Sequence, residues 1–157
     1  MSVSAEVVYV ERLDGVEPVH VSGFFEGWPN PPSPVMHLRL LRGSDHVVLA
    51  LEAHSGRVVG FVSALSDGVL SAYLPLLEVL PEYRGRGIGS ELVRRMLVQL
   101  GGLYMVDVLC DAALQPFYAR FGLQPSVGAS RRDHAQQSGA WSEVVTRTSS
   151  ERGSGPG

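Results

Sequence analysis

The 157-residue sequence has no lysine and a single cysteine, Cys110. One cysteine excludes an internal disulfide and a zinc site built from several cysteines, and it fits a reducing compartment. The longest apolar runs, such as Val47 to Leu51 and Leu74 to Leu77, are far shorter than the roughly 18 residues of a membrane helix. The first twelve residues carry Glu6 and Glu11 instead of the apolar core of a secretory signal. We therefore predict a cytoplasmic protein that does not enter membranes.

Charge is also scarce, since charged residues make up 18% of the chain and hydrophobic residues 45%. All 13 basic residues are arginines, and 16 acidic residues give a net charge of −3. This balance argues against a general nucleic-acid binder, which needs a basic face.

The length of the chain suits one domain. We predict a single domain over residues 1–148, followed by a disordered Ser-, Gly- and Pro-rich tail over 149–157.

Hydrophobic periodicity predicts a fold of the α/β (α+β) class, with a mixed, mostly antiparallel central sheet and helices on both faces. A loop with four prolines covers residues 28–34, and residues 126–139 are too polar for a clear element. We expect strands at 6–11, 45–53, 57–66, 70–80, 104–110 and 141–147, and helices at 16–28, 35–42, 88–100 and 114–121.

Residues 79–90 carry the clearest chemical signal. Gly85, Gly87 and Gly89 lie between an expected strand and a strongly amphipathic helix. Unpaired N–H groups at a helix start attract anions, and glycines let a phosphate approach the backbone closely. The spacing G-x-G-x-G differs from the dinucleotide fingerprint G-x-G-x-x-G, and the G-K-[ST] of a P-loop is missing. We interpret the segment as a pyrophosphate site, with an ordinary tight turn as the alternative.

Two blocks of the sequence resemble the GNAT superfamily of N-acetyltransferases. Arg84 to Gly89 (RGRGIG) resembles its acetyl-CoA signature R/Q-x-x-G-x-G/A, and residues 79–83 (VLPEY) look like the usual lead-in. Asp111 to Leu123 (DAALQPFYARFGL) is similar to the family helix that carries a tyrosine, here Tyr118. The resemblance covers residues 57–123. It implies a GNAT fold in which a splayed strand pair holds acetyl-CoA, and transfer to a primary amine in a ternary complex without a metal.

The resemblance also implies a set of cofactor-binding residues. The pantetheine arm would lie beside the end of the strand at 79–80, and the pyrophosphate would meet the amides from Gly85 to Ser90. Arg84 and Arg86 would add charge-assisted contacts. Asp111 stands where many relatives have asparagine, with helix capping as the alternative. The implied residues are Val79, Leu80, Arg84, Gly85, Arg86, Gly87, Ile88, Gly89, Ser90 and Asp111.

Two catalytic residues are predicted. The resemblance implies that Tyr118 is the general acid for the departing thiolate, with a core tyrosine bonded to backbone as the alternative. Glu78 is our candidate general base, because it interrupts the apolar run 74–80 and a carboxylate there needs a cleft or a partner. An ion pair on the sheet face is the alternative. Asp107 interrupts its strand similarly, and Tyr73 is a weaker candidate.

The remaining reactive residues do not form a second site. No histidine lies near Cys110 in sequence, so we expect Cys110 to be a small buried residue rather than a nucleophile. The five histidines are scattered, which argues against a metal site. The pair Arg131-Arg132 is expected to be solvated, with a contact to the 3′-phosphate of CoA as the alternative.

The acceptor is the least defined part. Phe24, Phe25, Glu26 and Trp28 precede the proline-rich loop, and aromatic faces with a carboxylate suit an amine with an apolar body. This slightly favours a small aryl- or alkylamine over a protein N-terminus or lysine. A non-catalytic acyl-CoA sensor and an interaction module stay as alternatives. The expected partner is the small-molecule amine, with a homodimer left open.

Overall fold

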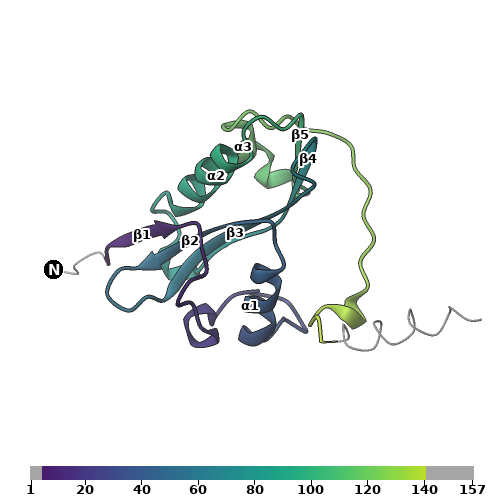
Figure 1. Ribbon diagram of the computed structural model, residues 1–157. Coiled ribbons are helices and arrows are strands. Elements are labelled where there is room, and N and C mark those ends of the chain that lie inside the picture. The colour runs from purple at the N-terminus through teal and green to yellow at the C-terminus, as the bar shows by residue number, and fades with distance from the viewer. Residues whose placement is uncertain (1–4, 141–157) are drawn as a thin grey trace, which may run out of the picture.

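The computed structural model describes residues 5–140, which form one sheet with helices on both faces (Figure 1). The strand order is β1-β2-β3-β4-β5, with three antiparallel pairs and a parallel β4–β5 pair. The predicted mixed, mostly antiparallel sheet is therefore confirmed. The strands are β1 (Val7–Val10), β2 (His46–Glu52), β3 (Val58–Ser66), β4 (Ser71–Val79) and β5 (Met105–Asp107).

Figure 1 shows α1 on one face of the sheet and α2 and α3 on the other. α1 (Pro34–Arg42) begins where the Ser33 side chain accepts the N–H of Met36, and Pro34 suits the first helical position. α2 (Ile88–Gln99) buries a stripe at helical spacing, as predicted. α3 (Gln115–Ala119) follows a short 3₁₀ turn. That turn is η3 (Ala112–Leu114), and the other 3₁₀ turns of the described residues are η1 (Pro18–Val21), η2 (Pro81–Tyr83) and η4 (His134–Gln136).

α2 packs tightly on the centre of the sheet. A Cβ at Gly60 of β3 would lie 3.1 Å from Leu92 Cδ1 and 3.2 Å from Ile88 Cγ2, so the helix approaches β3 closely only because residue 60 is glycine. β3 is buried from Val58 to Ala64, as expected for a central strand covered on both faces. This packing fixes the first turn of α2 beside the end of β4.

Within residues 5–140, no helix combines the length and apolar composition needed to cross a bilayer.

The predicted helix at 16–28 is wrong. Only η1 forms there, and the backbone then adopts positive φ at Gly23 (92°), Phe25 (65°) and Gly27 (78°). A right-handed helix cannot continue through such residues. We call residues 22–28 the aromatic loop, because Phe24 and Phe25 are buried in it while Trp28 is partly exposed.

The predicted buried strand at 104–110 is mostly wrong, whereas the predicted splay is confirmed. β5 pairs with β4 only from Ser71↔Met105 to Tyr73↔Asp107. Beyond this point the rest of β4 and the segment after β5 separate from each other. Met105 and Asp107 are exposed, because no further strand covers this edge within the described part of the chain. The separation leaves the rest of β4 without a neighbour on that side.

Residues 124–140, which we call the strap, take an extended path from the α3 side of the sheet to α1 (Figure 1). The strap ends in η4, and the Asn30 N–H donates to Gln137 Oε1 at 2.9 Å, so it is tied to the proline-rich loop. The predicted strand at 141–147 and tail at 149–157 lie outside the described residues.

Candidate functional site

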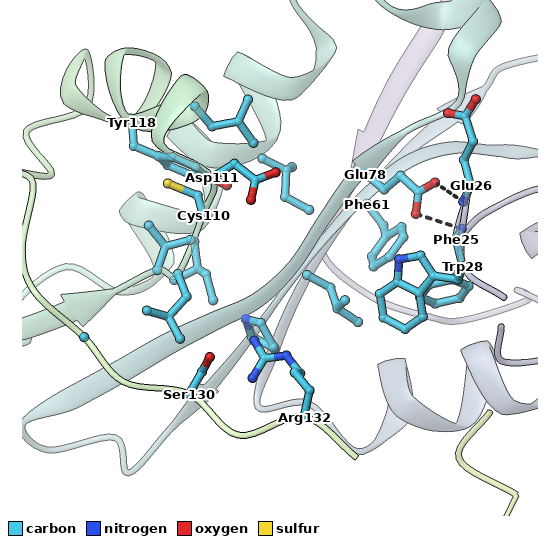
Figure 2. A pocket seen from close by; sticks show the side chains of 18 of the residues that line it. Phe25, Glu26, Trp28, Phe61, Glu78, Cys110, Asp111, Tyr118, Ser130 and Arg132 are labelled. Carbon is cyan, nitrogen blue, oxygen red and sulfur yellow. Dashed lines mark hydrogen bonds between the residues drawn. The ribbon is translucent and has the colours of Figure 1, made fainter. Parts of the chain in front are cut away.

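A cavity of about 770 Å³ occupies the gap between β4 and the segment after β5. β4 forms one wall, and residues 108–111 with α3 form the other (Figure 2). The aromatic loop and the strap close further sides. This volume lies in the usual range of small-molecule sites. The lining residues considered below are Phe25, Glu26, Trp28, Phe61, Glu78, Arg84, Cys110, Asp111, Tyr118 and Arg132.

The glycine loop presents a run of free backbone donors. Between Gly85 and Ser90, the Arg86 N–H closes the turn over Arg84 and Gly85, whereas the other five N–H groups donate to no residue that the structure describes. The first helical bond is from the Glu91 N–H to the Gly87 carbonyl at 3.1 Å. Gly85 (φ 73°) and Gly87 (φ 77°) adopt a conformation that favours glycine, and no atom lies within 4 Å of a Cβ built on either. Five free donors at and just before a helix start form an anion site.

The remaining residues of this segment have separate surroundings. The Ile88 side chain is 3% exposed, so this residue offers only its N–H to a ligand. Gly89 faces Phe117, with 3.8 Å between a built Cβ and the ring, and Ser90 Oγ accepts from Arg120 at 3.1 Å. The loop lies outside the cavity lining, at its exposed end.

Arg84 and Arg86 have different partners. The Arg84 guanidinium pairs with Glu26 at 2.8 Å, and its Nε donates to the Val79 carbonyl at 3.0 Å. It therefore connects the aromatic loop to the end of β4. Arg86 stacks over the Tyr83 ring at 4.9 Å and remains exposed beside the glycine loop.

Val79 and Leu80 present their backbones in opposite directions. The Leu80 N–H donates to the Val59 carbonyl at 2.8 Å, and the Leu80 side chain is 1% exposed. Because strand backbone groups alternate between neighbours, those of Val79 face the opposite edge, toward the gap. Of the two, Val79 has its backbone on the gap side.

Glu78 lies in the cavity wall with both carboxylate oxygens engaged. Oε2 accepts the Phe25 N–H at 2.9 Å and Oε1 accepts the Glu26 N–H at 3.2 Å (Figure 2). No ion pair of Glu78 occurs within residues 5–140, so the alternative of an ion pair on the sheet face is wrong. Each oxygen keeps a further acceptor site. Glu78 therefore holds the aromatic loop and still offers acceptors to the cavity.

Tyr118 reaches the cavity from α3 and is 7% exposed. Burial, with a smaller contribution from the charge of the Cys110 thiolate, raises the pKa of Tyr118 to about 12. The phenol therefore stays protonated at ordinary pH. Its hydroxyl makes no hydrogen bond to any residue in the described part of the chain, so the core-tyrosine alternative, which required a backbone partner, lacks its contact.

The other candidates occupy different positions. Asp107 and Tyr73 line a neighbouring cavity beyond β5 rather than this one. Asp111 lines this cavity, and its side chain does not cap η3, so the capping alternative is wrong.

Cys110 is half-buried at the wall rather than fully buried as expected, beside Tyr118 (Figure 2). No histidine lines either cavity within residues 5–140. Nor does that region hold a group of three potential metal ligands.

An aromatic cluster that includes His37 of α1 packs beside the cavity. The Phe25 ring lies 5.0 Å from Trp28 and 4.8 Å from His37, and His37 lies 4.5 Å from Phe61. His37 is 1% exposed and neither ring nitrogen has a partner within residues 5–140. Burial lowers its pKa to about 4, so His37 is neutral at pH 7 and packs as a flat ring. Sequence reasoning missed Phe61 and His37, which no local pattern separates from other core residues.

Comparisons with known proteins show the family of this chain. The model of the acetyltransferase (GNAT) family matches residues 13–123. A proposed acetyltransferase from Deinococcus radiodurans R1 is 48% identical, with 85% of this chain and 93% of that chain covered and a TM-score of 0.83. The fold and this similarity define an acetyltransferase. The chain belongs to the GNAT family.

More distant structures share the fold alone. A proposed GNAT acetyltransferase from Xanthomonas campestris pv. campestris is 23% identical, covering 85% of this chain and 97% of that one, with a TM-score of 0.67. An aminoglycoside acetyltransferase from an uncultured soil metagenomic sample is 22% identical over 82% and 98%, with a TM-score of 0.57. No curated protein matches the sequence significantly.

Proposed function

We propose that the protein is an acetyl-CoA-dependent N-acetyltransferase that acts on a primary amine by direct attack in a ternary complex. The observation that carries this proposal is the set of five free backbone N–H groups between Gly85 and Ser90, placed where β4 and β5 splay apart. Acetyl-CoA supplies the acetyl thioester and a thiolate leaving group. The residues of this chain supply binding, orientation and proton transfer.

The residues fit the parts of CoA in order. The free amides and the helix start suit the pyrophosphate, with Arg86 exposed beside them. The gap between β4 and residues 108–111 leads inward from there, and the backbone of Val79 and the side chain of Asp111 border it. This path ends near Tyr118 and Glu78, which lie on opposite walls (Figure 2).

We assign one proton transfer and one hydrogen bond to the residues of these walls. An attacking amine must be neutral, and Glu78 can accept its proton through the acceptor sites that the aromatic loop leaves unused. The Tyr118 hydroxyl, with a pKa of about 12, donates a hydrogen bond toward the sulfur. A free thiol has a pKa of about 8.5, so the phenol stabilises the developing charge more than it gives up its proton.

The cavity walls support a small aryl- or alkylamine as the acceptor. Phe25, Trp28 and Phe61 give it an apolar side, and Glu78 gives it a carboxylate. The strap crosses the same cavity, which leaves less room for a folded protein to bring in a lysine or N-terminus.

A screen of primary amines with acetyl-CoA and thiol detection tests this function. We expect amine-dependent thiol release. CoA binding without thiol release across the panel would instead indicate a non-catalytic acyl-CoA sensor, and absence of CoA binding would indicate an interaction module.

Trp28→Ala is expected to raise the amine KM about 5- to 10-fold, as for loss of a contact worth about 1 kcal/mol. Trp28 is 38% exposed, so CoA affinity and melting temperature should hardly change. Phe24→Ala is the contrasting variant, because Phe24 is buried, and it should cost about 3 to 5 kcal/mol of stability. An unaltered KM with a large fall in melting temperature for Trp28→Ala would make Trp28 a core residue.

Glu78→Gln is expected to lower kcat about 10²-fold near pH 7 and less at pH 10, where more amine is already neutral. The glutamine NH₂ group also faces one backbone N–H of the aromatic loop, so a hydrogen bond is lost because both groups are donors. This loss lowers the free energy of unfolding by about 1 kcal/mol. Glu82→Gln, at an exposed site outside the cavity, is the control with the same charge change. Wild-type rates across the whole pH range would remove Glu78 as the base and leave a water relay.

A further inference from the structure

Arg132 is a cation at the cavity that has no carboxylate partner among residues 5–140. The strap carries it to the cavity lining, and Figure 2 shows its guanidinium pointing from the strap into the cavity. Its one hydrogen bond, at 3.2 Å, goes to the carbonyl of the preceding residue. No acidic group of residues 5–140 lies within 4.0 Å of it. Arg132 is exposed, as predicted for a solvated arginine, and it also lines the cavity.

The other charged side chains that line the cavity either contact groups of the protein or lie near the proposed catalytic residues. Arg84 is neutralised by Glu26 at 2.8 Å. Glu78 is held by two N–H groups of the aromatic loop. Asp111 lies on the wall that carries Tyr118. Among residues 5–140, Arg132 thus remains as a positive charge that no carboxylate neutralises and that a ligand can neutralise.

The neighbours of Arg132 hold it in this position. Asp133, the adjacent carboxylate, accepts the Ala135 N–H at 3.1 Å as the cap of η4 and is not paired with Arg132. Gln137 ties the same end of the strap to Asn30 at 2.9 Å. These contacts hold the backbone of the residues that follow Arg132 in the sequence. The Arg132 side chain therefore enters the cavity from a segment that hydrogen bonds tie down.

We propose that the acceptor amine carries an anionic group, a carboxylate or phosphate, that Arg132 binds. This inference rests on the proposed function and deepens it by naming the substrate class. The guanidinium presents paired donors that match both oxyanions. The aromatic side of the cavity takes the apolar body, the amine lies near Glu78, and the anion lies on the strap side. Arg132 is a specificity-determining residue in this arrangement.

Matched amine pairs test the proposal by kcat/KM with thiol detection. The carboxylate pairs are 4-(aminomethyl)benzoate with benzylamine, and phenylalanine with phenethylamine. The phosphate pair is tyramine phosphate with tyramine. Wild type should prefer at least one anionic member by about 10-fold, the size expected for a partly exposed charge-assisted contact. The pair with the larger preference distinguishes carboxylate from phosphate.

Variants assign that preference to Arg132. Arg132→Gln should abolish it, Arg132→Lys should keep part of it, and both should bind CoA like wild type. Arg131→Gln removes the same charge from an exposed neighbour outside the cavity lining and should keep the full preference. Melting temperatures should be unchanged, because both arginines are exposed.

Four results would overturn the inference: equal use of anionic and neutral amines by wild type, an undiminished preference in Arg132→Gln, an equal loss in Arg131→Gln, or weaker CoA binding in Arg132→Gln. The last would place Arg132 on a CoA phosphate. Thiol release from neutral amines alone would leave the proposed function standing. Absence of release with every amine, despite CoA binding, would contradict the proposed function itself.

Discussion

Gly87→Glu is expected to weaken CoA binding by at least about 100-fold, as for the loss of several charge-assisted contacts. The substitution places an anion at the start of α2, where five N–H groups have no acceptor within residues 5–140. Like charge at a helix start repels a pyrophosphate that the free amides would otherwise bind. Calorimetric titration with CoA measures the effect.

The control for this variant must share its backbone strain. Gly87 has φ 77°, so any side chain there costs about 1 to 2 kcal/mol in stability whatever its charge. Gly15 has φ 73°, equally open surroundings and no part in the site, so Gly15→Glu reproduces the strain and the added charge. Equal CoA affinity in Gly87→Glu and Gly15→Glu would overturn the assignment of the glycine loop to the cofactor.

Tyr118→Phe is expected to lower kcat about 10²-fold with little change in CoA affinity. The phenol is the group on the α3 wall whose pKa, about 12, keeps it protonated, and its hydroxyl has no partner within residues 5–140. Removing it deletes a donor to the developing thiolate without opening a large cavity. Rates with acetyl-CoA and a saturating amine measure the loss.

The pH profile separates this role from packing. Because the raised pKa favours the neutral phenol, wild-type kcat should not fall through loss of the Tyr118 proton up to about pH 10, roughly two units below that pKa. Tyr9→Phe, on β1 and outside both cavities, should retain full activity. Wild-type kcat in Tyr118→Phe would return Tyr118 to a purely structural role.

Much of the architecture follows from local patterns. Runs of β-branched and apolar residues between turn residues predicted β2, β3 and β4 to within about two residues, and helical spacing with following glycines predicted α2. The glycine loop could be found because its chemistry lies within a few consecutive residues. The splayed strands followed from the family resemblance rather than from any pattern of the residues.

The parts that could not be predicted depend on contacts between distant segments. Phe25 adopts a positive φ that its residue type does not favour, and the Glu78 carboxylate, 53 residues away, holds its N–H. The Arg84–Glu26 pair joins residues 58 apart. Arg132 enters the cavity because η4 and Gln137 tether the strap. Composition alone indicates only a polar loop there.

The most direct test of the account is the amide spectrum of ¹⁵N-labelled protein during titration with CoA. The account places the pyrophosphate on the amides from Gly85 to Ser90, five of which have no acceptor in the described part of the chain. It predicts that these resonances show the largest shifts, followed by those of residues 108–111 across the gap. Unchanged resonances from Gly85 to Ser90 at a saturating CoA concentration, with shifts elsewhere, would contradict it.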